Sequence, residues 1–186
     1  MLDALIQKIK NQYGSKYGLK NQWKYSLKTR LGDFKKYKDI DFPKVNRLVF
    51  VCAGNICRSP LAEAVATDSG INAVSYGLSC RGGDKADQRA IKYAAQYGLN
   101  LEDHVTQNIK SYTPKDGDLL VGMEPFHVIS LEEAYGSETP ITLIGMWLSD
   151  SKAYIHDPFN ANEIFFNRCE NEIREATLSL AARMRQ

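Results

Sequence analysis

Hydrophobic and polar positions follow two different periods along the chain, and the periods alternate from residue 45 onward. Short runs rich in branched apolar side chains predict buried parallel strands. These runs cover residues 48–51, 73–76, 118–123 and 141–144. Apolar residues recurring every three or four positions predict helices between and after the strands. These segments cover residues 61–67, 86–94, 124–135 and a last helix that starts near residue 160 or 162.

The alternation of strands and helices predicts an α/β fold. We expect a small doubly wound four-stranded parallel sheet with helices on both faces. Ligands of such sheets bind beyond the carboxyl ends of the strands. The last helix is expected to bury one apolar face, made of Ile164, Cys169, Ile173, Ala176 and Leu180.

The first 44 residues carry a different pattern, which predicts a helical N-terminal extension. Two apolar stripes at helical spacing lie on either side of Gly18. The first contains Leu2, Leu5, Ile6, Ile9, Tyr13 and Tyr17, and the second contains Trp23, Leu27, Leu31 and Phe34. Pro43 disfavours helix in the residue before it and closes this segment. We therefore divide the chain into an extension, residues 1–44, and a domain, residues 45–186.

Charge separates the same two parts. Residues 1–44 hold 11 Lys or Arg against 4 Asp, a net charge of +7, whereas the remainder holds 13 basic against 18 acidic residues, a net charge of −5. The simplest interpretation is a solvated face on helices that pack against the domain. An anionic membrane surface, an acidic protein or nucleic acid are the alternative partners. No nucleic-acid-binding motif is present, so we expect no specific nucleic-acid partner.

The cysteines and the first residues of the chain indicate the cellular compartment in which the protein is expected. The four cysteines lack zinc-type spacing, and we expect neither a metal nor a cofactor. Residues 1–10 lack the apolar stretch of a signal peptide, and no apolar run reaches the ~18 residues that a membrane span requires. These features predict a cytoplasmic protein.

The candidate chemistry lies where the first predicted strand ends. Cys52 follows this strand directly, and Ser59 and Pro60 predict the cap and the first position of a helix. Residues 53–57 must then form a tight loop whose backbone N–H groups point inward, with Gly54 allowing conformations closed to other residues. Such a loop at a helix N-terminus predicts a site for phosphate or a similar oxyanion.

Arg58 follows Cys52 by six positions, so that its guanidinium can bind two oxygens of the anion. The same positive field lowers the pKa of a thiol, which predicts that Cys52 is a thiolate nucleophile. The alternative is a small buried hydrophobe at residue 52 and a surface arginine at 58. The combination of both residues with Gly, Asn, Ser and Pro between strand and helix favours the catalytic interpretation.

The stretch from Val51 to Pro60, Val-Cys-Ala-Gly-Asn-Ile-Cys-Arg-Ser-Pro, resembles the motif of the low-molecular-weight protein tyrosine phosphatases. The resemblance runs from about residue 45 to the C-terminus and is nearest the bacterial branch of capsule and exopolysaccharide synthesis. It implies hydrolysis of phosphotyrosine through a phosphocysteine intermediate, with Cys52 as nucleophile and Arg58 on the phosphate. The phosphate-binding residues implied are Ala53, Gly54, Asn55, Ile56, Cys57 and Ser59.

Asp157-Pro158-Phe159 resembles the family's second motif, which implies that Asp157 is the general acid and that Phe159 is a wall for the substrate ring. Arg81 lies where related bacterial members place an apolar residue at the pocket mouth. Tyr76 and Tyr97 lie where many eukaryotic members have the Ser and His that support the loop asparagine. Support for Asn55 is therefore expected to come partly from elsewhere.

Two rival activities stay open. An arsenate reductase on the same fold would need shuttle cysteines, and Cys80 and Cys169 do not form the close downstream pair of the thioredoxin-coupled type. A non-catalytic phosphotyrosine-binding module would not need Cys52, Arg58 and Asp157 together. The partner implied is a phosphotyrosine protein, with a bacterial tyrosine kinase as the specific expectation.

Every predicted site residue lies at or beyond Cys52, so the extension is expected to be dispensable for chemistry. The sequence leaves the oligomeric state open.

Overall fold

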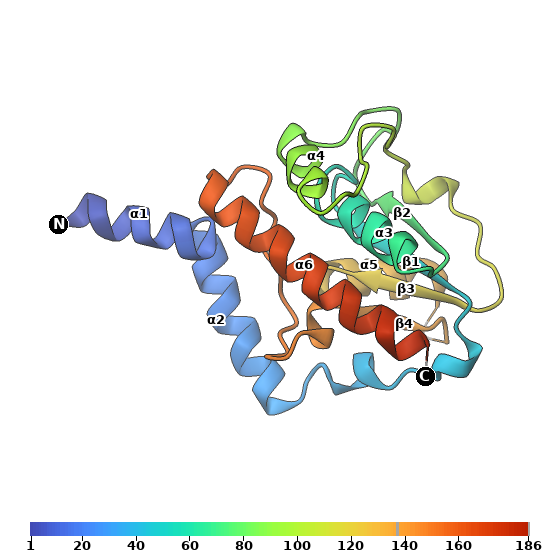
Figure 1. The fold of residues 1–186 in the computed structure, drawn as a ribbon. Coiled ribbons are helices and arrows are strands. Elements are labelled where there is room, and N and C mark those ends of the chain that lie inside the picture. The colour runs from blue at the N-terminus through green and yellow to red at the C-terminus, as the bar shows by residue number, and fades with distance from the viewer. Residues whose placement is uncertain (137, 186) are drawn as a thin grey trace.

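The computed structural model describes residues 1–136 and 138–185. Its centre is a four-stranded sheet in the order β2-β1-β3-β4, in which every neighbouring pair is parallel (Figure 1). The strands are β1 (Arg47–Cys52), β2 (Ala73–Gly77), β3 (Asp118–Gly122) and β4 (Ile141–Leu143). The helices that alternate with them are α3 (Arg58–Asp68), α4 (Gln88–Ala95), α5 (Pro125–Tyr135) and α6 (Glu163–Met184). Short 3₁₀ turns are η1 (Lys35–Lys38), η2 (Phe42–Lys44), η3 (Ile109–Ser111) and η4 (Ile144–Trp147).

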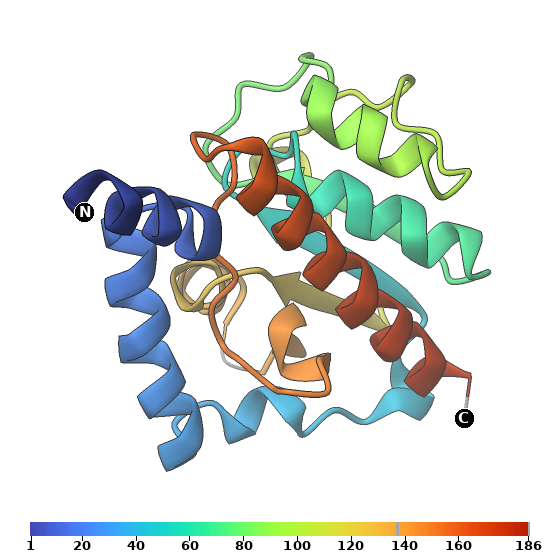
Figure 2. The same ribbon diagram turned by 60° about the vertical axis from the view of Figure 1, so that its left-hand side comes forward.

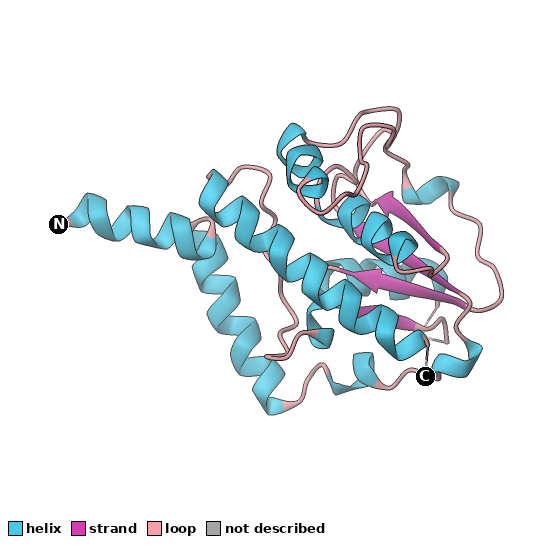
Figure 3. Cartoon of the chain, viewed as in Figure 1, coloured by secondary structure: helices cyan, strands magenta, loops and turns pink. Residues whose placement is uncertain are grey.

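Strand β1 is buried along its whole length because helices cover both faces of the sheet (Figure 3). Leu48 and Phe50 pack in one apolar cluster with side chains of α3, α4 and α6. Val49 and Val51 face the other way and pack in a second cluster with side chains of α5. Successive strand residues point to opposite faces, so a run without polar positions is what a strand covered on both sides requires. The predicted α/β fold is confirmed.

The extension forms two helices, α1 (Leu2–Tyr13) and α2 (Lys16–Leu31), as predicted, but the break between them is not at Gly18. The chain turns at Gly14, which has φ 75°, and Ser15 caps α2 by accepting a hydrogen bond from the Gly18 N–H at 2.8 Å. Gly18 lies inside α2, where the helix closely approaches both the end of α1 and the domain. A Cβ at this position would lie 2.0 Å from the Tyr13 carbonyl oxygen and 2.8 Å from Cδ2 of His156.

The apolar stripe predicted for α2 is not its docking face. Trp23 is 73% exposed and Leu31 is 71% exposed, whereas Gly18 and Asn21 are buried. The chain after α2 does enter the core, since Phe34 and Tyr37 belong to the second apolar cluster. The division of the chain at residue 44 stays a prediction. Figure 2 shows α1 and α2 beside the loop that leads into α6.

Helix α6 buries Cys169, Ile173, Ala176 and Leu180 as predicted, but Ile164 is 60% exposed. Ile164 lies in the first turn, where the neighbouring Phe165 and Phe166 take the buried positions instead. Among the described residues, the model contains no helix whose length and apolarity would allow it to cross a membrane.

Candidate active site

The loop after β1 brings its side chains around the Cys52 sulfur. Helix α3 begins at Arg58, so the predicted start at Ser59 and Pro60 is wrong by two positions. Ser59 therefore does not cap the helix. Its Oγ lies 3.0 Å from Sγ of Cys52, which also accepts a hydrogen bond from the Asn55 N–H at 3.2 Å. Both contacts favour a negative charge on the sulfur when the hydroxyl donates.

Asn55, and not Gly54, supplies the left-handed backbone of the loop, with φ 56°. Asn tolerates this conformation better than most residues. Its side-chain amide is held on both ends. Nδ2 donates to Ser59 Oγ at 2.9 Å and to Ser75 Oγ at 2.8 Å, and Oδ1 accepts from the backbone N–H of Gln107 at 2.8 Å.

The Asn55 carbonyl oxygen lies 2.8 Å from Nε2 of His104. Ser75 and His104 therefore support Asn55, in place of the residues at positions 76 and 97. Both lie far from the loop along the chain, which is why the sequence analysis did not select them. The position of Ser75 directly before Tyr76 was the one sign in the sequence that a serine could support Asn55.

Arg58 is buried, with 1% of its residue surface exposed, and spans three segments of the chain. Its Nη1 donates to Glu124 Oε1 at 2.7 Å and to the Ile155 carbonyl at 3.0 Å. Its Nη2 donates to Asp157 Oδ2 at 2.5 Å. Burial acts against the charge on Arg58, but Asp157 and then Glu124 outweigh it and raise the pKa of the guanidinium. Glu124 is a site residue that the sequence analysis missed.

Asp157 lies in a loop fixed from the side of α4. Asp157 Oδ1 accepts from the Phe159 N–H at 3.0 Å. Arg89 donates to the Phe159 carbonyl at 2.7 Å and to the Ala161 carbonyl at 3.0 Å. Asp87 forms a two-point ion pair with Arg89, at 2.7 and 3.1 Å. The Cys52 loop and the Asp157 motif, separated by about a hundred residues, are therefore joined by the contact between Arg58 and Asp157. Arg89 holds the Asp157 loop in place from α4.

A cavity of about 220 Å³ opens between the two motifs. Its lining residues are Cys52, Ala53, Gly54, Ile56, Cys57, Arg58, Ser79, Asp157 and Phe159. Asn55 and Ser59 are buried behind this lining, where they contact the sulfur. Arg81 is exposed and is not a lining residue, and Ser79 from the same loop takes a place at the rim.

The remaining cysteines differ from Cys52 in their surroundings. Burial, with a smaller contribution from Glu170, raises the pKa of Cys57, so this residue is a thiol at neutral pH. Cys169 is buried on α6, and burial raises its pKa strongly too. Cys80 lies in the loop after β2, where its thiol donates to the Gln107 carbonyl at 3.3 Å.

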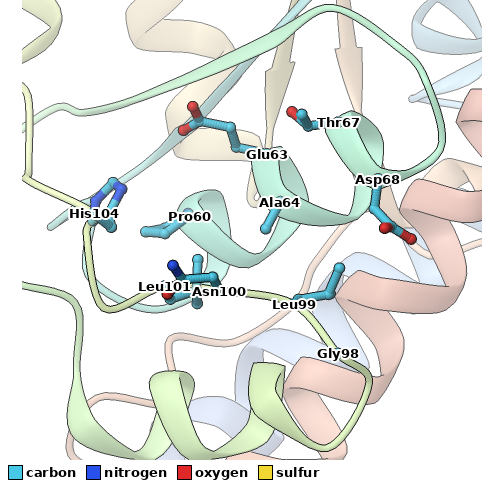
Figure 4. A pocket seen from close by; sticks show the side chains of 10 residues that line it. All are labelled: Pro60, Glu63, Ala64, Thr67, Asp68, Gly98, Leu99, Asn100, Leu101 and His104. Carbon is cyan, nitrogen blue, oxygen red and sulfur yellow. The ribbon is translucent and has the colours of Figure 1, made fainter.

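A second hollow, of about 390 Å³, lies between α3 and residues 98–104 (Figure 4). It is larger than the cavity at Cys52, but its lining contains no cysteine and no arginine. His104 lies on its rim and contacts Asn55 with its ring. The smaller cavity is therefore the candidate site for a phosphate, since Cys52 and Arg58 line it together.

Comparison with known proteins agrees with this arrangement. Residues 47–186 match the family described as low molecular weight phosphotyrosine protein phosphatase. The low molecular weight protein-tyrosine-phosphatase Wzb of Salmonella typhi is 31% identical over 144 residues, which cover 74% of this chain and 95% of that protein.

Two solved structures share the fold. Vibrio vulnificus Wzb in complex with benzylphosphonate has a TM-score of 0.64 at 27% identity, covering 75% of this chain and 99% of that one. The YwlE arginine phosphatase from Geobacillus stearothermophilus has a TM-score of 0.64 at 22% identity, covering 75% and 93%, which shows likeness of fold alone. By its sequence match and its fold, the chain belongs to the low molecular weight phosphotyrosine protein phosphatase family.

Proposed function

We propose that this protein is a protein-tyrosine phosphatase that works through a phosphocysteine on Cys52. The observation that carries the proposal is one cavity lined by Cys52, Arg58 and Asp157. A nucleophile, a cation for the phosphate and a carboxyl for the leaving group are the three groups that this reaction needs. The proposed roles of the loop residues follow from their places around that cavity.

In the first step the loop N–H groups and Arg58 bind the phosphate, and Cys52 Sγ attacks phosphorus in line with the ester bond. The P–O bond breaks, and Asp157 gives its proton to the departing tyrosine oxygen. Asp157 forms an ion pair with Arg58, with 2.5 Å between Oδ2 and Nη2. A phosphate on Arg58 takes over that pairing and leaves the carboxyl free to carry a proton toward the leaving group.

In the second step a water molecule attacks the phosphorus of phosphocysteine. The Asp157 carboxylate accepts the proton of that water, the S–P bond breaks and inorganic phosphate leaves. The Ser59 hydroxyl, 3.0 Å from Sγ, donates to the sulfur as it becomes a thiolate. Asn55 keeps the loop in the conformation that this donation requires.

The substrate follows from the shape of the site and from its relatives. Phe159 is half exposed at the cavity mouth, where an aromatic side chain suits a phenyl ring. The Vibrio relative binds benzylphosphonate, which carries a phosphonate on a benzyl group. We propose phosphotyrosine in a protein as the substrate, and a bacterial tyrosine kinase as the specific partner.

Leaving-group dependence tests these roles. We expect Cys52→Ser to abolish turnover. We expect Asp157→Ala to lower turnover of phenyl phosphate by about 100-fold or more, and that of 4-nitrophenyl phosphate far less, because 4-nitrophenolate leaves without a proton. Equal losses on both esters would contradict the acid role. Faster turnover of phosphoarginine than of phosphotyrosine peptides would contradict the proposed substrate.

We also propose that the extension contacts an anionic membrane surface. Trp23, Leu27 and Leu31 form an exposed stripe on α2 at a spacing of four residues. Lys20, Lys24 and Lys28 form an exposed parallel stripe beside it. A helix with exposed apolar and aromatic side chains flanked by lysines suits the boundary of anionic lipids.

A further inference from the structure

The extension contacts the segment that carries Asp157. We define residues 153–157 as the acid loop. Side chains of α2 lie against this loop along much of the helix, from its cap at Ser15 to Thr29. The contacts involve polar and small side chains, and they lie on a different face of α2 from the exposed Trp23.

A chain of hydrogen bonds connects α2 to the residue before Asp157. Asn21 Nδ2 donates to the Tyr154 hydroxyl at 3.4 Å, and the hydroxyl lies 2.6 Å from Nδ1 of His156. Nε2 of His156 lies 3.1 Å from Ser15 Oγ. Burial lowers the pKa of His156, so the neutral ring has one N–H. Each ring nitrogen of His156 has one hydroxyl partner, Tyr154 at Nδ1 and Ser15 at Nε2, and the two contacts together fix the orientation of the ring.

Further contacts fix the same loop on either side of His156. Tyr25 stacks on Tyr154, with ring centroids 5.3 Å apart and an interplanar angle of 26°. The Ala153 N–H donates to Thr29 Oγ1 at 3.3 Å. Beyond Asp157, Asn162 at the start of α6 donates to Asn11 of α1 at 2.7 Å. The extension therefore contacts the chain both before and after Asp157.

The acid loop faces two ways. Tyr154 and His156 contact α2, whereas the Ile155 carbonyl and the Asp157 carboxylate contact Arg58. Any shift of residues 154 and 156 relative to α2 must shift the Asp157 carboxyl relative to Arg58 and the cavity. A displacement of about 1 Å at a catalytic group is enough to lower a rate substantially.

From this geometry we infer that α2 is a positioning element for the acid step, acting on Asp157 through Ser15, Tyr154 and His156. The inference rests on the proposed function, in which Asp157 protonates the leaving group. It replaces the expectation from sequence that the extension is dispensable for chemistry. Ser15, Tyr154 and His156 are positioning residues, since none of them lines the cavity.

The test uses full-length variants and two esters that differ in leaving group. Tyr154→Phe removes the hydroxyl that orients His156 and keeps the ring that stacks on Tyr25. Ser15→Ala removes the hydroxyl that contacts Nε2 of His156. Arg30→Ala changes an exposed residue of the same helix that belongs neither to the contacts with the acid loop nor to the proposed membrane stripes, and it is the control. We expect Tyr154→Phe and Ser15→Ala to lower turnover of phenyl phosphate by about tenfold and that of 4-nitrophenyl phosphate by less than about twofold.

A double variant and a structural measurement separate the outcomes. In the Asp157→Ala background, Tyr154→Phe should cause no further loss on phenyl phosphate, because it acts through the missing carboxyl. Amide hydrogen exchange at residues 153–157 should rise in Tyr154→Phe and not in Arg30→Ala. A rise in exchange without a change in leaving-group dependence would overturn the inference and leave the proposed function intact. An Asp157→Ala variant that affects both esters equally would instead overturn the acid role itself.

Discussion

At the scale of single residues, Arg58 joins three parts of the chain through acceptors on Glu124, Ile155 and Asp157. Removing one partner from a buried ion pair leaves the other charge without compensation, and this costs more than the same change at the surface. In the proposed mechanism, Asp157 leaves the guanidinium of Arg58 when phosphate binds. Glu124 is then the carboxylate that we expect to stay paired with Arg58 throughout the reaction.

We predict that Glu124→Gln lowers the free energy of unfolding by about 2 kcal/mol, because a buried charge-assisted hydrogen bond is weakened. The control is Asp33→Asn, which breaks the surface pair with Lys28 at 3.3 Å and should cost less than about 1 kcal/mol. Urea unfolding followed by circular dichroism measures both. Equal losses in the two variants would show that the Arg58 pair is no stronger than a surface pair.

Glu170 is a second residue whose surroundings affect stability, in this case its dependence on pH. It is fully buried on α6, and among the described residues neither of its carboxyl oxygens has a hydrogen-bond partner. Burial raises its pKa to about 8 from 4.5. Between these values the folded protein holds a proton that the unfolded chain has lost, so stability falls as pH rises across this window.

We predict that Glu170→Gln flattens this dependence. The difference in melting temperature, variant minus wild type, should increase as the pH rises from 5 to 8, because glutamine has no proton to lose. Melting temperatures at several pH values measure the effect. Glu175→Gln, on the exposed side of the same helix, is the control and should keep the wild-type slope. A wild-type slope in Glu170→Gln would contradict a raised pKa at this residue.

At the scale of elements, the strands and the helices of the domain could be predicted because their patterns depend on burial that the sequence records directly. The docking of α2 could not. Its contact face consists of Ser15, Gly18, Asn21, Tyr25 and Thr29, which hydropathy does not distinguish from a solvated surface. Gly18 was taken for a break in the helix, but glycine is required there by the close approach of the Tyr13 carbonyl and of His156.

The candidate site could likewise be predicted only in part from the sequence. The spacing of Cys52 and Arg58 and the second motif at Asp157 were visible in the sequence because each motif is local. The groups that hold them, such as Glu124, Ser75 and His104, come from distant segments that only the fold brings together. The sequence analysis expected the unusual backbone conformation of the loop at Gly54, because glycine generally prefers it. In the structure Asn55 has the left-handed conformation, and the hydrogen bonds of the Asn55 side chain stabilise it there.

At the scale of the whole molecule, the charge asymmetry predicts how the protein meets a membrane. We expect it to sediment with vesicles that contain phosphatidylserine and not with phosphatidylcholine alone. Replacing Lys20, Lys24 and Lys28 by Glu should weaken this binding by roughly a hundredfold, since each lysine contributes about 1 kcal/mol near such a surface.

The matched control replaces Lys92, Lys110 and Lys115 by Glu. These exposed lysines belong to the domain, and their loss changes the net charge by the same amount. Equal weakening by both triple variants would show that total charge, and not the face of α2, governs binding. Binding to an acidic protein with no affinity for anionic vesicles would contradict the membrane proposal.

The contact between Ser15 and His156 joins residues 141 positions apart in the chain. During synthesis α1 and α2 are made before the sheet, yet residues 153–157, which cover their polar face, are made after all four of its strands. Short helices are marginal in water until a partner buries them. The loop at residues 53–57, by contrast, has the groups that hold Asn55 once Gln107 has been made. We therefore expect a nascent chain to complete this loop well before the carboxyl of Asp157 is in place, and full activity to begin only when α2 meets residues 153–157.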